Sequence, residues 1–203
     1  MRPVPPRSQG KTALDHVEDQ PADSARLHDV SVDSPVVVRD IDEEFGGRLF
    51  HLVTRLDREP PPAANISTAH CLAFDGDQIV LALHANRGWT VPGGHLEDGE
   101  SAETAMRREA LEEAGAVVIN GRVFAHEQID PYDGVAVDPR YPVPAFQVFF
   151  VARVVSLGEI TATDECSEAR LFAPDEARVA EGWVQRNRPL YEAALRIALT
   201  ESP

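Results

Sequence analysis

The sequence predicts an α/β fold, an α/β/α sandwich in which helices cover both faces of a mixed sheet. Strand-like apolar runs occur on both sides of residues 102–114, and those residues have the spacing of a helix. Two further helical stretches follow the last strand-like run and can supply the second helical layer.

The composition fits one domain of about 140 residues with an appendage. The chain has 203 residues, of which 43% are hydrophobic, and 19 Lys and Arg stand against 34 Asp and Glu, giving a net charge of −15. Such a charge repels phosphate backbones and anionic lipids, so neither nucleic acid nor a membrane is expected as a partner. An anionic substrate would then need a bridging metal ion.

The cysteine content indicates a reducing compartment. Cys71 and Cys166 are the two cysteines, and they do not form a CxxC pair. The first residues contain Arg2 and three prolines but no apolar run, which is unlike a signal peptide or a membrane span. We therefore expect a cytoplasmic protein.

The composition divides the N-terminal part of the chain into two segments. Residues 1–34 lack an apolar period and are expected to be a disordered tail. Residues 35–62 are expected to be an accessory helical segment, either packed on the domain or forming a homodimer surface. Its apolar residues recur at helical spacing over residues 40–59, although two glycines interrupt them: Ile41, Phe45, Leu49, Leu52, Val53 and Leu56. Three prolines then mark a boundary, and residues 63–203 form the expected catalytic domain.

The domain begins with a predicted hairpin. Ile66–Phe74 and Gln78–Ala85 are strand-like runs on either side of Asp75-Gly76-Asp77, a strong turn signal. Val117–Ile129 is expected to form one or two strands with a break at Gly121, and Ala145–Val155 a central strand.

The remaining segments complete the sheet and its second helical layer. Residues 130–144 form a loop with four prolines, either a substrate rim or a variable surface loop. Ser167–Phe172 is expected to be a short strand, and Pro174 and Pro189 are expected to start helices. Trp183, Leu190, Ala194 and Ile197 would form the apolar side of the last helix.

A short acidic helix is predicted over Ala102–Ala114. Ser101 suits its N-cap, and Gly115 suits the left-handed position at its end. Glu109, Glu112 and Glu113 fall on one side of this helix, where like charges repel unless a cation lies among them. Oxygen ligands favour Mg²⁺ or Mn²⁺ over zinc. The alternative is a solvated acidic helix.

The loop before the helix favours the metal interpretation. Gly94, Glu100, Arg108, Glu109, Glu112, Glu113 and Gly115 match the pattern Gly-x5-Glu-x7-Arg-Glu-hydrophobic-x-Glu-Glu-x-Gly-hydrophobic. This stretch, from Gly94 to Ala116, resembles the signature box of the Nudix hydrolases, with alanine at 110 and 116 where larger aliphatic residues are usual. The resemblance implies the α/β/α sandwich and hydrolysis of a nucleoside diphosphate linked to another moiety.

The resemblance also implies roles for the box residues. Glu109 and Glu113 would be the main metal ligands, Glu112 a ligand or the general base, and the Gly94 carbonyl a further ligand. Arg108 and Glu100 resemble the family's internal salt bridge. The alternative for Arg108 is a surface pair with Glu112.

Outside the box, the assignments stay open. Glu165 resembles an additional catalytic acid of many relatives, or is a solvated loop residue. Arg87 could contact a phosphate or be a surface arginine, and His84 and His95 are expected to be bystanders.

Several substrates and two other functions also remain open. Pro131 resembles a residue of ADP-ribose-cleaving relatives and Tyr132 one of dinucleoside-polyphosphate-cleaving relatives, and oxidised dNTPs are a third option. The alternatives are a non-catalytic nucleotide-sensing module and an isopentenyl-diphosphate-isomerase-like enzyme, the latter suggested by His70-Cys71.

Overall fold

The computed structural model describes residues 35–136, 138–160 and 165–201. The expected tail over residues 1–34 lies outside the described residues. The strands are β1 Val36–Phe45, β2 Arg48–Leu56, β3 Ile66–Asp75, β4 Gln78–His84, β5 Gly88–Thr90, β6 Gly93–His95, β7 Ala116–Pro131, β8 Ala145–Leu157 and β9 Cys166–Phe172. The helices are α1 Ala102–Ala114, α2 Pro174–Val179, α3 Trp183–Arg186 and α4 Arg188–Thr200, with a 3₁₀ turn at Ala63–Asn65.

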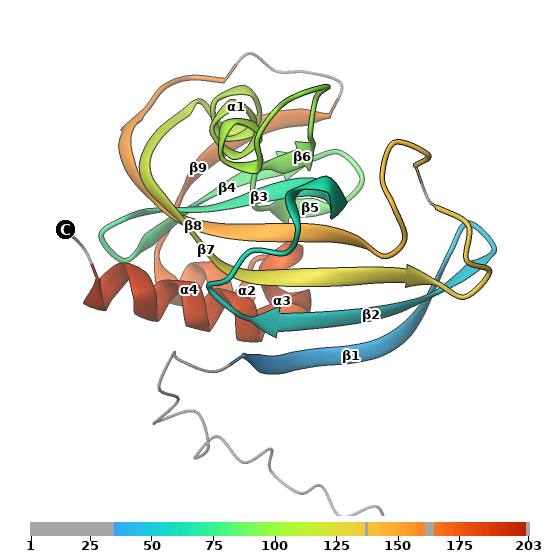
Figure 1. The fold of residues 1–203 in the computed structure, drawn as a ribbon. Coiled ribbons are helices and arrows are strands. Elements are labelled where there is room, and N and C mark those ends of the chain that lie inside the picture. The colour runs from blue at the N-terminus through green and yellow to red at the C-terminus, as the bar shows by residue number, and fades with distance from the viewer. Residues whose placement is uncertain (1–34, 137, 161–164, 202–203) are drawn as a thin grey trace, which may run out of the picture. The chain divides into compact units, whose positions relative to one another are not determined.

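Within the described residues, nine strands form one mixed sheet in the order β1-β2-β7-β8-β3-β4-β5 (Figure 1). Strands β3 and β8 are parallel, whereas β7 is antiparallel to both β2 and β8. Strand β6 pairs with β3, and β9 pairs with β4. The mixed sheet confirms the predicted fold class.

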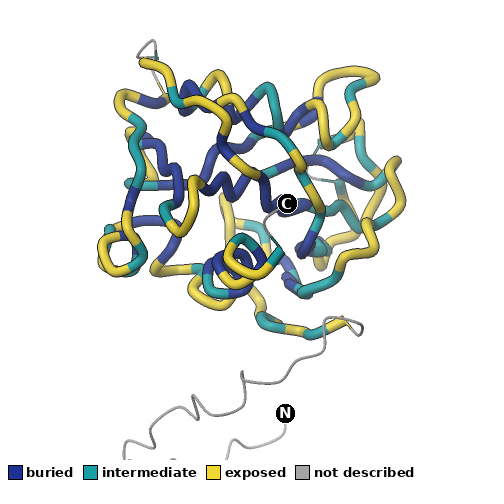
Figure 2. Tube along the Cα trace, turned by 90° about the vertical axis from the view of Figure 1, so that its left-hand side faces the viewer, coloured by how far each residue is buried: buried dark blue, intermediate teal, exposed yellow. Residues whose placement is uncertain are grey.

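Helices cover both faces of the sheet, and the two resulting cores use alternate residues of β3. Leu72 and Phe74 pack with the helices after β9, whereas Cys71 and Ala73 pack with α1. The buried segments in Figure 2 accordingly run through the middle of the molecule, between exposed outer elements. The α/β/α arrangement therefore follows from a sheet whose side chains are apolar on both faces.

The predicted strands and helices after residue 63 are present. Gly76 occupies the β3–β4 turn at φ +61°. Strand β7 is continuous but has a bulge near Gly121, where a Cβ atom would lie 2.3 Å from Cε of Met106. A glycine is needed there because α1 packs directly on the strand. Trp183, assigned above to the last helix, lies instead in α3.

The prediction of an accessory helix over residues 40–59 is wrong. The segment forms a β-hairpin, in which Phe45 pairs with Arg48 and the turn is Gly46-Gly47. Both glycines have positive φ, +57° and +77°, which closes a two-residue hairpin and would break a helix. Strand β2 also pairs with β7, so the hairpin extends the central sheet.

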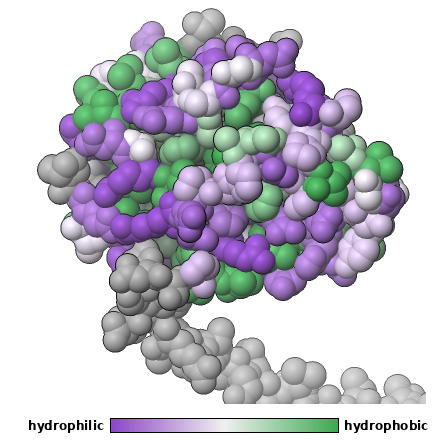
Figure 3. Space-filling view, in the orientation of Figure 1, coloured by the Kyte–Doolittle hydropathy of each residue, from purple (hydrophilic) through white to green (hydrophobic). Residues whose placement is uncertain are grey.

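The surface agrees with the strongly acidic composition. The face shown in Figure 3 is covered largely by hydrophilic residues, with hydrophobic residues between them in separate patches. Among the described residues, no helix has the length and apolar character needed to cross a membrane.

Candidate active site

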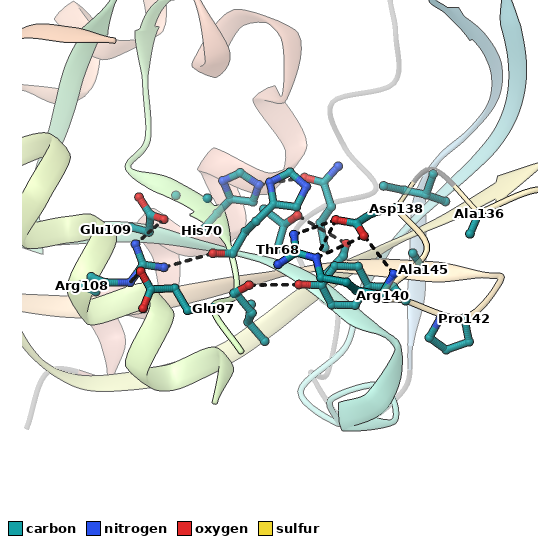
Figure 4. A pocket seen from close by; sticks show the side chains of 18 of the residues that line it. Thr68, His70, Glu97, Arg108, Glu109, Ala136, Asp138, Arg140, Pro142 and Ala145 are labelled. Carbon is teal, nitrogen blue, oxygen red and sulfur yellow. Dashed lines mark hydrogen bonds and ion pairs between the residues drawn. The ribbon is translucent and has the colours of Figure 1, made fainter. Parts of the chain in front are cut away.

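A cleft of about 640 Å³ lies where the loop before α1 meets the ends of β3 and β8. Figure 4 shows Arg108 and Glu109 on one side of it, and Asp138 and Arg140 on the other. The predicted site residues that line it are Arg87, Gly94, Arg108, Glu109, Glu113 and Glu165. Residues from both sides of the motif therefore meet in one cleft.

Two glycines bring the loop against the helix. A Cβ atom on Gly94 would lie 2.3 Å from Oε1 of Glu109, and one on Gly93 would lie 2.3 Å from Nδ1 of His70. Strand β6 holds both glycines in place by pairing with β3. Only a residue without a side chain allows the backbone to approach the carboxylate this closely.

Helix α1 presents the carboxylates, and its ends are those that the sequence predicts. The Ser101 side chain accepts a hydrogen bond from the Thr104 backbone amide, and Gly115 has φ +63°. Ala105, Met106 and Ala110 are fully buried against the sheet. This packing fixes the rotation of the helix about its axis, so that Glu109 and Glu113 face the cleft.

Glu109 and Glu113 are held in a partly dehydrated environment. Glu109 is 9% exposed, and the backbone amide of Gly93 donates to Oε2 of Glu113 at 2.9 Å. Burial raises the pKa of both carboxyls above the usual value, even though Arg108 near Glu109 and the Gly93 amide near Glu113 act in the opposite direction. Burial therefore disfavours the charged form of each carboxyl.

Arg108 connects the helix to the loop. Its Nε and Nη2 atoms donate to the two carboxylate oxygens of Glu100 at 3.1 and 3.0 Å, and Nη2 also donates to the carbonyl of His95 at 3.0 Å. Its Nη1 donates to Glu109 at 2.8 Å and to Glu112 at 3.1 Å. The contact with Glu100 lowers the pKa of Glu100 and raises the pKa of Arg108. The structure thus contains both contacts considered for Arg108.

Glu100 and Glu112 lie outside the lining of the cleft. The Glu112 side chain is 58% exposed, whereas the Glu100 side chain, which pairs with Arg108, is only 8% exposed. Arg87 and Glu165, by contrast, do line the cleft, and both influence the pKa of Glu113: Arg87 lowers it and Glu165 raises it.

Sequence reasoning did not predict the residues deep in the cleft, and it considered His70 only together with Cys71. His70 and Gln147 lie there, with Nε2 of His70 and Oε1 of Gln147 2.8 Å apart, and the His70 ring stacks on Phe149 at 5.1 Å. Burial lowers the pKa of His70 to about 4. These residues are 77 positions apart and meet because β3 and β8 are parallel, a pairing that no local pattern indicates.

His70 and Cys71 do not form a common site. Adjacent strand residues point to opposite faces, so His70 lines the cleft while Cys71 is fully buried in the core beneath α1. Burial raises the pKa of the Cys71 thiol to about 12. The pair that suggested an isomerase therefore gives that alternative no support.

The loop between β7 and β8 contributes the opposite wall. Asp138, Arg140 and Tyr141 line the cleft, and the Tyr141 hydroxyl donates to the Leu96 carbonyl at 3.1 Å. Arg140 donates to both carboxylate oxygens of Asp138. The loop is thus anchored to the segment that leads into α1.

The donor set fits a hard divalent cation. Glu109 and Glu113 present carboxylate oxygens to the cleft beside the Gly94 backbone, and oxygen ligands are those that Mg²⁺ and Mn²⁺ prefer. In the described part of the chain, no three His, Cys, Asp or Glu side chains already converge closely enough to hold an ion. Arg108 occupies Oε1 of Glu109 and Oε2 of Glu112, so an ion would compete with this guanidinium.

Comparisons with known proteins identify a domain family. Residues 64–194 match the NUDIX domain. An uncharacterised Nudix hydrolase of Bacillus subtilis, YvcI, is 40% identical over 52 residues, which are 25% of this chain and 33% of the relative. The match thus spans only about a third of that curated relative.

Among solved structures, a pyrophosphohydrolase has the same fold. The Bacillus subtilis pyrophosphohydrolase BsRppH superposes with a TM-score of 0.57 at 18% identity, covering 78% of this chain and 96% of that one. A Streptococcus suis ADP-ribose pyrophosphatase has a TM-score of 0.48 at 22% identity, covering 68% and 93%. Because the NUDIX domain matches more than half of the sequence, the family resemblance is confirmed, and the chain belongs to the Nudix hydrolase family.

Proposed function

We propose that the protein is a divalent-metal-dependent pyrophosphohydrolase that cleaves a nucleoside diphosphate linked to another moiety. The observation that supports this most directly is the pair of carboxylates, the buried Glu109 and the partly buried Glu113, which face one cleft beside the Gly93-Gly94 backbone. Nudix hydrolases generally use divalent metal ions. The ADP-ribose, dinucleoside-polyphosphate and oxidised-dNTP alternatives all contain the anhydride that such a site cleaves.

The residues of this chain would have the following roles in the reaction. Glu109, Glu113 and the Gly94 carbonyl would hold Mg²⁺ or Mn²⁺, which when bound acidifies a water molecule and polarises a phosphoryl oxygen. Glu112 or Glu165 would accept the proton from the attacking water. Arg87 would bind a phosphate, and Arg108 with Glu100 would keep the loop and helix in register.

The partners and location follow from the same features. We propose a nucleotide-type small molecule as the substrate and a cytoplasmic location, which suits two buried cysteines. A homodimer through the N-terminal hairpin is a further proposal. Such a dimer would not form by pairing the β1 edges of two copies, because like charges would then meet. Strand β1 contains four acidic residues: Asp40, Asp42, Glu43 and Glu44.

The proposal is tested by turnover on a panel of ADP-ribose, NADH, diadenosine tetraphosphate, sugar nucleotides and oxidised dNTPs, with phosphate release measured after phosphatase treatment. We expect Glu113→Gln to lower turnover by about 10²–10⁴-fold in Mg²⁺ while the protein stays folded. Glu103→Gln is the matched control, because Glu103 lies on the same helix but is exposed. Full activity of Glu113→Gln would contradict the mechanism, and cleavage of no substrate would favour a nucleotide sensor.

A further inference from the structure

A second hollow, of about 340 Å³, lies next to the cleft, and half of its lining residues belong to the N-terminal hairpin. We call it the hairpin groove. Its lining includes Arg39, Phe45, Phe50, Ile129, Gln147 and Arg186. The hairpin residues lie before residue 64, where the match to the NUDIX domain begins. The hairpin side of the groove therefore lies outside the matched domain, and its other side lies within it.

The hairpin groove adjoins the cleft. Ile129 and Gln147 line both hollows, so the two share part of their walls. Gln147 is oriented by its contact with His70 on the cleft floor at 2.8 Å. A ligand that fills the cleft and extends past Gln147 would enter the hairpin groove.

The groove offers an aromatic surface in a polar setting. Phe45 is 51% exposed, and its ring centroid lies 5.9 Å from that of the buried Phe50. An exposed phenyl group at the tip of an acidic hairpin costs hydration free energy unless something covers it. Flat rings of nucleotides stack on such side chains irrespective of their hydrogen-bonding pattern.

Charged and amide groups surround this surface. Arg39 donates to Glu43 at 2.5 Å and to Glu127 at 3.4 Å, and the exposed Arg186 donates to the Arg87 carbonyl at 3.3 Å. Carboxylates accept hydrogen bonds from ring amino groups, and guanidinium groups bind phosphate oxygens. The combination suits a nucleoside better than a sugar or an aliphatic chain.

We propose that the hairpin groove binds the second ring of a substrate that has a flat ring at each end, so that the substrate is a dinucleotide or a dinucleoside polyphosphate. The phosphates and the first nucleoside would occupy the cleft, and the second ring would cover Phe45. This inference rests on the proposed pyrophosphohydrolase function and specifies its substrate class.

The test uses NADH and ADP-ribose, which share the adenosine diphosphate ribose unit and differ by the nicotinamide ring, with diadenosine tetraphosphate as a third substrate. The wild type should have the lower KM for the two-ring substrates. Phe45→Ala should raise that KM about tenfold, leave kcat unchanged and leave the KM for ADP-ribose unchanged. Phe45→Tyr should restore the low KM because it keeps the ring.

Leu49→Ala is the matched control, because Leu49 is 46% exposed on the same hairpin but does not line the groove. Equal KM values for NADH and ADP-ribose in the wild type would contradict binding of a second ring in the hairpin groove. So would an equal effect of Phe45→Ala on the two KM values. Either result would leave the proposed hydrolase function intact. A changed oligomeric mass of Phe45→Ala with unchanged ring preference would assign the hairpin to contact between copies, which also overturns the proposal. Cleavage of no substrate would overturn both.

Discussion

Arg108 joins three carboxylates and one carbonyl, and this position explains how a single side chain can set the geometry of the site. Its guanidinium reaches Glu100 in the loop and Glu109 and Glu112 on the helix. A planar group with donors in fixed directions can satisfy these acceptors together, whereas a lysine ammonium cannot. Glu109 in the cleft is therefore held by the same guanidinium that fixes the loop through Glu100.

We expect Arg108→Ala to lower the free energy of unfolding by about 1.5–3 kcal/mol, because it leaves the nearly buried Glu100 and Glu109 without their charged donor. Urea unfolding in the absence of divalent ions measures this loss. Arg153→Ala is the control and should cost less than about 0.5 kcal/mol, because Arg153 is exposed on β8. Equal losses in the two variants would show that the Arg108 network has no structural role.

His70 gives a prediction about pH. Burial lowers its pKa from 6.5 to about 4, so the folded state resists protonation more than the unfolded state does. The stability that neutral His70 contributes is therefore present above pH 6.5 and is lost as the pH falls toward 4. The raised pKa values of Glu109 and Glu113 act in the opposite direction, so the His70 effect must be isolated by comparison.

Between pH 7 and pH 5, the wild type should lose about 1–2 kcal/mol more stability than His70→Gln does. Denaturant unfolding of both proteins at the two pH values measures the difference. His51→Gln serves as the control for replacing a histidine, because His51 lies at the surface of the hairpin. Parallel pH profiles for the wild type and His70→Gln would contradict the assignment of a buried neutral imidazole.

At the level of elements, helix α1 could be predicted because its signals are local. The cap at Ser101, the left-handed Gly115 and the buried stripe of small residues all lie within 15 positions of one another, so the sequence determines both ends of the helix. The residues of the motif could be predicted for the same reason. His70 and Gln147 could not, because their meeting depends on the order and direction of strands far apart in the chain.

The N-terminal hairpin shows how a local pattern can mislead. Ile41, Phe45 and Leu49 are spaced four residues apart, which matches a helix, but in the structure each of the three is more than a third exposed. They do not form the buried stripe that the spacing suggested. The residues that are buried lie on β2, where Phe50 and Leu52 alternate with the more exposed Leu49 and His51. A period of two, read together with Gly46-Gly47, indicates the hairpin.

A hairpin and a helix predict stability changes of opposite sign when Gly47 is replaced by alanine. Gly47→Ala should destabilise the protein by about 1–2 kcal/mol, because an L-residue at φ +77° is strained. In a helix the same substitution would stabilise by about 1 kcal/mol. Thermal unfolding distinguishes the two signs. Gly158→Ala is the control, because a Cβ atom there meets only the Gly115 carbonyl at an ordinary 3.6 Å.

On the scale of the whole molecule, negative charge is the dominant property. The net charge of −15 opposes the approach of an anionic nucleotide, and the carboxylates of the cleft add to this opposition. Arg87 and Arg140 are the arginines of the cleft lining besides Arg108, and Arg140 is already paired with Asp138. A bound cation would therefore serve substrate binding as well as chemistry, and it would relieve the mutual repulsion of Glu109 and Glu113.

This argument predicts that divalent ions stabilise the folded protein. An ion at 100 times its Kd adds about 2.7 kcal/mol, which for a chain of this size raises Tm by about 5–10 °C. Mg²⁺ should produce this rise in the wild type and in Glu103→Gln, but a much smaller one in Glu113→Gln. In EDTA at pH 7, Glu113→Gln should melt above the wild type, because a buried carboxylate with a raised pKa destabilises the fold at that pH. At pH 4 that difference should shrink as Glu113 becomes protonated. The same Mg²⁺-dependent rise in all three proteins would place the ion away from the cleft.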